Sequence, residues 1–272
     1  MDEPSARPPE TQPEETANQV GLVLRAVGRG LWRGTRAVGL GVAAAWQAID
    51  PDVRRHLLQV PLLLYSPLGS RARPVVAGVP DGHPPLVLVH GLGGTRGDLL
   101  PLALYLALHG RKRSYRVGFS FKQDLPAQAA ALAAFVRQVL EVTGEPRVDM
   151  VTHSLGGLVA RLALADAELA GRVGTLVTLG APHGGTYTAR YADTTNTRVL
   201  RPDSELIREL ARAGLPAGVR VVACWSRADV FVLPPESAVP AGAEAVELTG
   251  THYGYLLSPT SWEAVRRALA GG

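Results

Sequence analysis

The chain has 272 residues, of which 46% are hydrophobic and 19% are charged, and its formal net charge is +4. This length suits one large α/β domain with an extension, and no apolar run is long enough to be a confident membrane span. The positive charge comes from arginine, since Lys112 and Lys122 are the only lysines. Basic and aromatic residues are not interleaved in the sequence, so no nucleic-acid partner is expected. The only cysteine, Cys224, excludes an intramolecular disulfide and a thiolate metal cluster, and we expect it in the core.

The chain before residue 74 differs in composition from the rest. Residues 1–19 are rich in Pro, Glu, Thr and Gln, so we expect them to be disordered. Residues 20–73 are expected to form a helical extension and a hinge. Within it, Val20–Ile49 predicts an amphipathic helix that either docks on the body of the protein or lies peripherally on an anionic membrane. Because the N-terminus is acidic, unlike that of a signal peptide, we expect a cytoplasmic or peripherally membrane-associated protein rather than a secreted one.

From residue 74 to 272, short apolar runs alternate with helical patterns. The runs predict strands at Leu86–Val89, Tyr115–Phe121, Val148–Val151, Val173–Leu179, Val219–Trp225 and Ala245–Leu248. Helices are predicted from about Arg96 to Leu108, at Pro126–Val142, directly after Ser154, from Asp203 or Ser204 to Arg212, and at Ser261–Ala270, whereas Tyr187–Arg201 is polar and irregular. This alternation predicts a doubly wound, mainly parallel α/β sheet with helices on both faces.

The third of these strands turns into its helix at Ser154, and the period of the apolar residues changes there. Gly156 and Gly157 follow, as a sharp turn with closely packed elements requires. The pattern is that of a nucleophile elbow, G-x-S-x-G, with Thr152 in place of the first glycine. A plain strand-to-helix turn would look similar, so the interpretation depends on partners elsewhere in the chain.

A serine hydroxyl needs a base, and His252 is the best placed of the seven histidines. It follows the last predicted strand, on a loop from which an imidazole can reach the turn. His153 is expected to point away from the elbow, and His90 and His183 to lie near the site but on other loops. The remaining histidines fall in the extension or on surface connections: His56, His83 and His109.

Asp229 is the best candidate for the acid that orients this histidine, because it stands just past the strand Val219–Trp225, at the same sheet edge. The other candidates lie on the following helix, in the polar insertion or beyond it: Asp166, Asp193, Asp203 and Glu236. The backbone N–H groups of Leu155 and Leu92 are the expected donors to an oxyanion.

Four motifs occur together in a fixed order: His90-Gly-Leu-Gly-Gly94, Thr152-His-Ser-Leu-Gly-Gly157, Gly180-Ala-Pro-His-Gly-Gly-Thr186 and Gly250-Thr-His252. With Asp229, they resemble bacterial lipases of the α/β-hydrolase fold, from about Leu86 to the C-terminus. The resemblance implies Ser154 as nucleophile, His252 as general base, Asp229 as acid, and Leu92 and Leu155 as the oxyanion hole. The departure at Thr152 is mild, since small lipases of this kind carry alanine there, and the extension before residue 74 has no counterpart.

These observations predict a serine hydrolase that cleaves carboxylic esters, of lipids above all, through an acyl-enzyme and without a metal or cofactor. Substrate is expected to enter over an apolar rim beside Leu92, Leu155 and the insertion 186–216, which is short enough to allow only a small lid. The alternatives are a thioesterase or phospholipid acyl hydrolase with the same triad, or a non-catalytic scaffold of the same fold.

Overall fold

The computed structural model describes residues 70–120 and 123–271, together with Asn18, Arg54, Gln59 and Pro67. Apart from those four positions, the segments before residue 70, including the helix predicted at Val20–Ile49, lie outside the described residues. The helix and its membrane role therefore stay predictions. In the described part of the chain, no helix has the length and hydropathy needed to cross a membrane.

Six strands form one sheet, in the order β2-β1-β3-β4-β5-β6, and every neighbouring pair is parallel. Their bounds are β1 Leu86–Val89, β2 Ser114–Arg116, β3 Val148–His153, β4 Val173–Leu179, β5 Arg220–Trp225 and β6 Glu244–Glu247. Because all strands run the same way, the loops that leave their carboxyl ends gather at one edge of the sheet.

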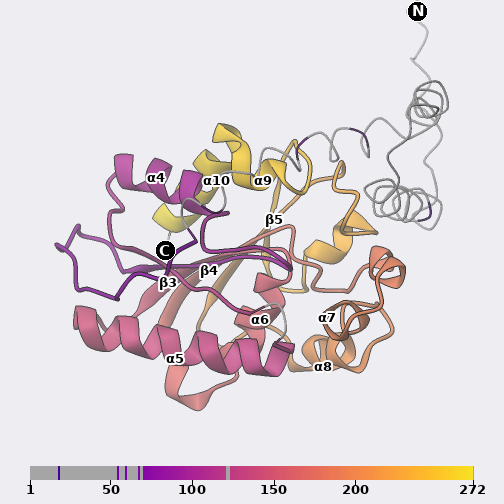
Figure 1. The fold of residues 1–272 in the computed structure, drawn as a ribbon, viewed down its shortest axis with the longest axis horizontal. Coiled ribbons are helices and arrows are strands. Elements are labelled where there is room, and N and C mark those ends of the chain that lie inside the picture. The colour runs from indigo at the N-terminus through magenta and orange to yellow at the C-terminus, as the bar shows by residue number, and fades with distance from the viewer. Residues whose placement is uncertain are drawn as a thin grey trace, which may run out of the picture.

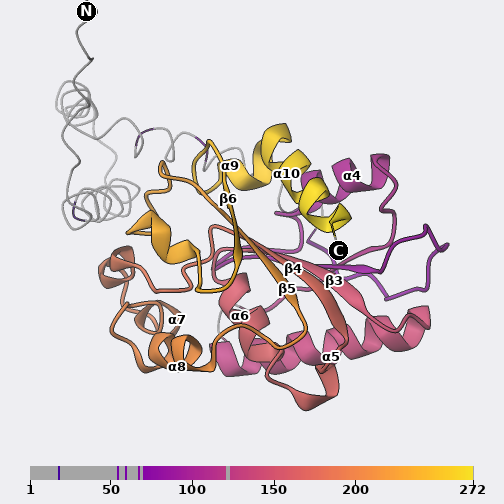
Figure 2. The ribbon, with the colours of Figure 1, turned by 180° about the vertical axis from the view of Figure 1, so that it is seen from behind.

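Helices cover both faces of this sheet (Figures 1 and 2). One face carries α4 (Leu100–Leu108), α9 (Gly254–Leu257) and α10 (Pro259–Ala270). The other carries α5 (Leu125–Thr143) and α6 (Gly156–Ala163), with α7 (Thr195–Arg198) and α8 (Glu205–Ala213) beside them. Among the described residues, three short 3₁₀ helices lie in the connections, at Ala167–Leu169, Tyr187–Tyr191 and Pro235–Ala238. The predicted doubly wound architecture is confirmed.

The two faces have separate apolar cores because successive strand residues point to opposite sides. In β1, Val87 and Val89 pack against the α5 and α6 side, whereas Leu86 and Leu88 pack against the α4 and α10 side. Cys224, in β5, is fully buried in the second core, as predicted. The continuous apolar runs thus reflect a sheet that is covered on both faces.

The structure corrects two predicted elements. The strand predicted near Tyr115–Phe121 ends already at Arg116, because the chain leaves the sheet where Phe119 N–H donates to the His90 ring (3.2 Å). The helix predicted from Arg96 begins at Leu100, because Asp98 N–H donates to the carbonyl of Thr95 (3.1 Å) and closes a turn first. The region predicted as irregular, Tyr187–Arg201, contains one of the 3₁₀ helices and α7.

Candidate active site

Ser154 occupies the junction of β3 and α6 in a strained conformation. Its φ angle is 52°, and it is the only residue other than glycine with a positive φ among those described. A left-handed conformation is unfavourable for a residue with a side chain and is retained mostly where function requires it. Its own N–H donates to the carbonyl of Leu179 on β4 (2.9 Å), which anchors the turn.

The glycines around this turn are required by close packing. A Cβ atom on Gly91 would lie 2.9 Å from the Cβ of Ser154, and one on Gly157 would lie 2.5 Å from the Cβ of Ala181. A Cβ on Gly156 would lie 2.7 Å from the carbonyl oxygen of His90. The motif thus places the loop after β1, the elbow and the loop after β4 in direct contact.

Asp229 and His252 form a buried hydrogen-bonded pair. The Nδ1–H of His252 donates to Oδ2 of Asp229 (2.8 Å), and the aspartate is 2% exposed. The other carboxylate oxygen, Oδ1, accepts the backbone N–H groups of Phe231 (2.9 Å) and Val232 (3.1 Å). These donors stabilise an ionised carboxylate, and the carboxylate selects the tautomer with the proton on Nδ1 and the lone pair on Nε2.

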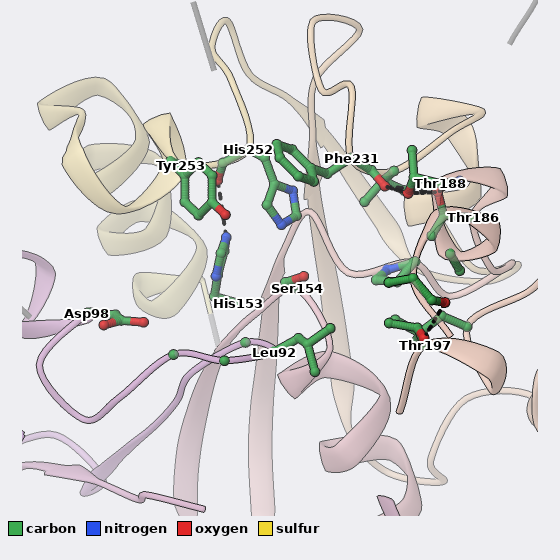
Figure 3. A pocket seen from close by; sticks show the side chains of 18 of the residues that line it. Leu92, Asp98, His153, Ser154, Thr186, Thr188, Thr197, Phe231, His252 and Tyr253 are labelled. Atoms are coloured by element: carbon green, nitrogen blue, oxygen red, sulfur yellow. Dashed lines mark hydrogen bonds between the residues drawn. The ribbon is translucent and has the colours of Figure 1, made fainter. Parts of the chain in front are cut away.

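A cavity of about 500 Å³ brings Ser154 and His252 to one surface. Figure 3 shows Ser154 between two sides of this cavity. One side carries His153, Tyr253 and the carboxylate of Asp98. The opposite side carries Phe231 and the hydroxyls of Thr186, Thr188 and Thr197. Small and apolar residues also line the cavity: Pro182, Ala189, Ala192, Leu200 and Val232. Asp229 does not line the cavity, and its hydrogen bond to His252 connects it to a residue that does.

Leu92 and Leu155 occupy different places. Leu92 lines the cavity and its side chain is 44% exposed, as expected for a residue at the rim. The side chain of Leu155 is buried in the core, so the prediction that it forms part of the entry rim is wrong. Its backbone still follows Ser154 directly at the start of α6, where no side chain caps the helix. Uncapped N–H groups at a helix start suit a developing negative charge.

His153 was expected to point away from the elbow, and this is wrong. It lines the cavity, its ring centroid is 4.7 Å from that of His252, and its Nε2 lies 3.1 Å from the His252 carbonyl oxygen (Figure 3). Burial, and then the nearby His252, lower the pKa of His153 to about 3. The imidazole is therefore neutral and can donate Nε2–H to that carbonyl, which fixes the main chain that carries His252.

Two further histidines, His90 and His183, are buried outside the cavity lining. His90 bonds through Nδ1 to the carbonyl of Gly91 (2.9 Å), and burial lowers its pKa. Nε2 of His183 lies 3.3 Å from the hydroxyl oxygen of Thr178, and burial lowers the pKa of His183 to about 3. Neither lines the cavity, in agreement with their assignment to other loops.

The remaining acidic candidates lie outside the cavity lining. Asp166 caps a 3₁₀ helix and bonds Arg137, and Asp193 pairs with Arg198. Among the described residues, no three His, Cys, Asp or Glu side chains meet in a group that could hold a metal ion.

Comparison with known proteins links part of the chain to lipases. The model of a family described as the PGAP1-like alpha/beta domain matches residues 115–207. Two triacylglycerol lipases, from Pseudarthrobacter phenanthrenivorans and Burkholderia plantarii, are each 31% identical in an alignment of 109 residues that covers 37% of this chain. The matched part covers 34% and 30% of those proteins, so the chain spans about a third of the length of these relatives.

Solved structures match over more of the chain. Lipase B from Aspergillus fumigatus has a TM-score of 0.61 at 20% identity, covering 70% of this chain and 53% of its own. The mature lipase BlEst2 from Bacillus licheniformis has a TM-score of 0.58 at 17% identity, covering 72% of this chain and 96% of its own. The chain therefore has the α/β-hydrolase fold.

Proposed function

We propose that the protein is a serine hydrolase that cleaves carboxylic esters, with the acyl group of a lipid as its substrate. The observation that carries the proposal is the buried Asp229–His252 hydrogen bond, whose histidine lines the same cavity as the strained Ser154. The chain order Ser154, Asp229, His252 is that of α/β hydrolases. The similarity to two triacylglycerol lipases supports an ester as the bond that is cleaved.

Acylation of Ser154 is the first half of the reaction. Nε2 of His252 accepts the hydroxyl proton while Oγ of Ser154 attacks the carbonyl carbon of the ester. The tetrahedral oxyanion accepts hydrogen bonds from the N–H groups of Leu92 and Leu155. The intermediate collapses as the bond to the alcohol oxygen breaks, and the imidazolium of His252 returns its proton to that oxygen. The alcohol leaves, and the acyl group remains on Ser154.

Deacylation repeats the same steps with water. Nε2 of His252 takes one proton from the water as its oxygen attacks the acyl carbon, and then returns the proton to Oγ of Ser154. The carboxylic acid is released and the serine is restored. In both halves Asp229 stays ionised and stabilises the imidazolium, since two backbone N–H groups hold its other oxygen.

The cavity suits an acyl chain of moderate length. Its volume of about 500 Å³ lies within the usual range for small-molecule sites, about 300–1,000 Å³. The side formed by Ala189, Ala192 and Leu200 is apolar, so burial of methylene groups there stabilises the complex by about 0.8 kcal/mol each. We assign this side to the acyl chain and the side with Asp98 and Tyr253 to the alcohol.

The Ser154→Ala variant tests the proposal. It removes only a hydroxyl, so the protein should keep its melting temperature but lose hydrolysis of p-nitrophenyl esters. A fluorophosphonate probe should label the wild type and leave the variant unlabelled. Wild-type turnover in the variant would refute the assignment. A profile of the wild type over p-nitrophenyl esters from acetate to palmitate, thioesters and phospholipids identifies the class of acyl donor.

A further inference from the structure

A second hollow, of about 360 Å³, lies at the β2 edge of the sheet, between α4 and the segment 71–76. We call it the cationic groove, because five cationic residues line it and no Asp or Glu does. The five are Arg71, Arg73, Arg96, Lys112 and Arg116.

The cations of the groove form no ion pair with the described residues, in contrast to their sequence neighbours. Arg111 pairs with Asp149 (2.6 Å), and Arg113 pairs with Glu145 (2.8 Å), both as buried cations. Within the described part of the chain, none of the five groove cations forms an ion pair. The segment 111–116 therefore directs two paired cations inward, whereas Lys112 and Arg116 line the groove and their side chains form no ion pair with the described residues.

The inner cations of the groove are held close together. Arg116 is half-buried, and its Nη1 donates to the carbonyl of Arg96 (3.1 Å). The guanidinium of Arg96 lies so close to Gly118 that a Cβ there would be 2.5 Å from its Cζ. Burial, and then the positive charges of Arg73 and Arg96, lower the pKa of Arg116. An anion in the groove would offset this repulsion and the incomplete solvation of Arg116.

Exposed apolar side chains border the cations. Val76 is 60% exposed and Leu104 is 56% exposed, and both line the groove. Leu108, 85% exposed, follows one turn later on the same face of α4. The segment that carries Val76 is held against β2, because the hydroxyl of Tyr115 donates to the carbonyl oxygen of Val76 (2.8 Å). Apolar side chains that project beside a cluster of cations are typical of surfaces that bind anionic lipid.

The cationic groove and the candidate active site are adjacent along two segments of the chain. Arg96 lines the groove, while Gly94 and Asp98, on either side of it, line the cavity with Ser154. Pro67 lines the cavity, and Arg71 lines the groove. One end of the groove therefore lies near the loop after β1, which also lines the cavity.

We propose that the cationic groove binds the phosphate of an anionic lipid headgroup, with Val76, Leu104 and Leu108 in contact with the apolar part of the bilayer. Several guanidinium groups match the planar, multidentate recognition of phosphate. The exposed apolar border distinguishes a lipid-borne phosphate from a free one, which would need no such surface.

The test is flotation of the full chain with vesicles of phosphatidylcholine alone or with added phosphatidylglycerol. The wild type should bind the anionic vesicles more tightly. The Arg73→Gln/Lys112→Gln variant should bind them at least about tenfold more weakly, since each cation near a membrane contributes about fivefold. The matched control is Arg147→Gln/Arg172→Gln, which removes two exposed cations at the amino ends of β3 and β4. It should bind like the wild type, and all variants should keep the wild-type melting temperature.

Two further measurements separate the sources of the phosphate. The Leu104→Gln/Leu108→Gln variant should weaken vesicle binding and leave the binding of inorganic phosphate, measured by calorimetry, unchanged. Binding of inorganic phosphate without any binding of anionic vesicles would overturn the lipid assignment. Equal loss in the groove variant and the control would show only general attraction by net charge and would overturn the groove. Because binding is measured, the result does not depend on the proposed hydrolysis.

Discussion

Asp229 combines near-complete burial with a negative charge, which is costly unless the charge is compensated. Its compensation comes from the His252 ring on one oxygen and from two backbone N–H groups on the other. In the proposed mechanism, a carboxylate in this position stabilises the imidazolium that forms when Ser154 loses its proton. The structure therefore gives Asp229 surroundings that its competitors in the sequence lack.

Asp229→Asn should lower kcat for ester hydrolysis by about 10²–10⁴, because the amide keeps the shape but removes the charge and disturbs the tautomer of His252. Steady-state kinetics with a p-nitrophenyl ester measures the loss. Asp166→Asn and Asp203→Asn are the controls and should be nearly neutral, since neither residue lines the cavity. A larger loss in either control would assign the acid to that residue.

His153 is expected to act through His252 as a positioning residue. His153→Leu removes the donor to the His252 carbonyl and should lower kcat about tenfold with little change in KM, since a lost hydrogen bond in a buried site typically costs about 1–2 kcal/mol. His153→Gln keeps an N–H donor of similar reach and should restore most of the activity. Equal activity of the Leu variant and the wild type would refute the positioning role.

The wrong prediction for His153 has its physical origin in the backbone. In a regular strand, side chains at successive positions point to opposite sides, so a residue next to Ser154 is expected to point away from the site. The φ angle of 52° at Ser154 breaks this alternation, and His153 and Ser154 both reach the cavity. The sequence motif indicates the turn, but it does not show the backbone angle at Ser154 or the contact of His153 with His252.

At the level of elements, the buried strands were predictable, whereas the extent of the edge strand β2 was not. The strand β1 is a continuous apolar run, and β3 and β4 are mainly apolar and buried along almost their whole length, because both of their faces are covered. β2 has three half-buried residues, and its end is determined by the bond of Phe119 N–H to His90, a contact distant in sequence. The short helices between Tyr187 and Arg201 are stabilised by threonine hydroxyls that cap their ends, in a stretch too polar to show an apolar period.

The insertion after β4 forms the side of the cavity that we assign to the acyl chain, so its bulk should control chain length. Ala192→Phe places a ring where Ala192 lines the cavity and should lower kcat/KM for palmitate relative to acetate by about tenfold or more, because a few methylenes lose their burial. Kinetics over p-nitrophenyl esters measures this ratio. Ala192→Ser is the size-matched control. A uniform loss over all chain lengths would contradict the assignment of this side.

For the whole molecule, the neutral buried histidines predict an acid-sensitive fold. The pKa values of His153 and His183 are about 3 in the folded protein, against an ordinary 6.5. Below pH 6.5 the unfolded chain binds a proton at each and the folded protein does not, so stability is complete above pH 6.5 and falls as the pH falls toward 3. At pH 5 the loss should be about 2 kcal/mol for each histidine.

Urea unfolding at pH 7.5 and pH 5 measures this loss. The His183→Gln variant should lose about half as much stability between the two pH values as the wild type, whatever its stability at pH 7.5. Equal stability of the wild type at both pH values would show that these histidines gain protons in the folded protein.

Cys224 gives the molecule a use in labelling experiments. It is the only thiol in the sequence. It is fully buried in β5, where it is paired with Leu179 of the neighbouring strand β4, and burial raises the pKa of the thiol to about 12. A thiol reagent should therefore react with the native protein only when the sheet opens, and its rate reports that opening directly. By the same reasoning, a cysteine placed on the surface, beside the cationic groove or at the cavity rim, would be the only reactive thiol of the folded chain. A fluorophore could be attached there without first removing a native cysteine.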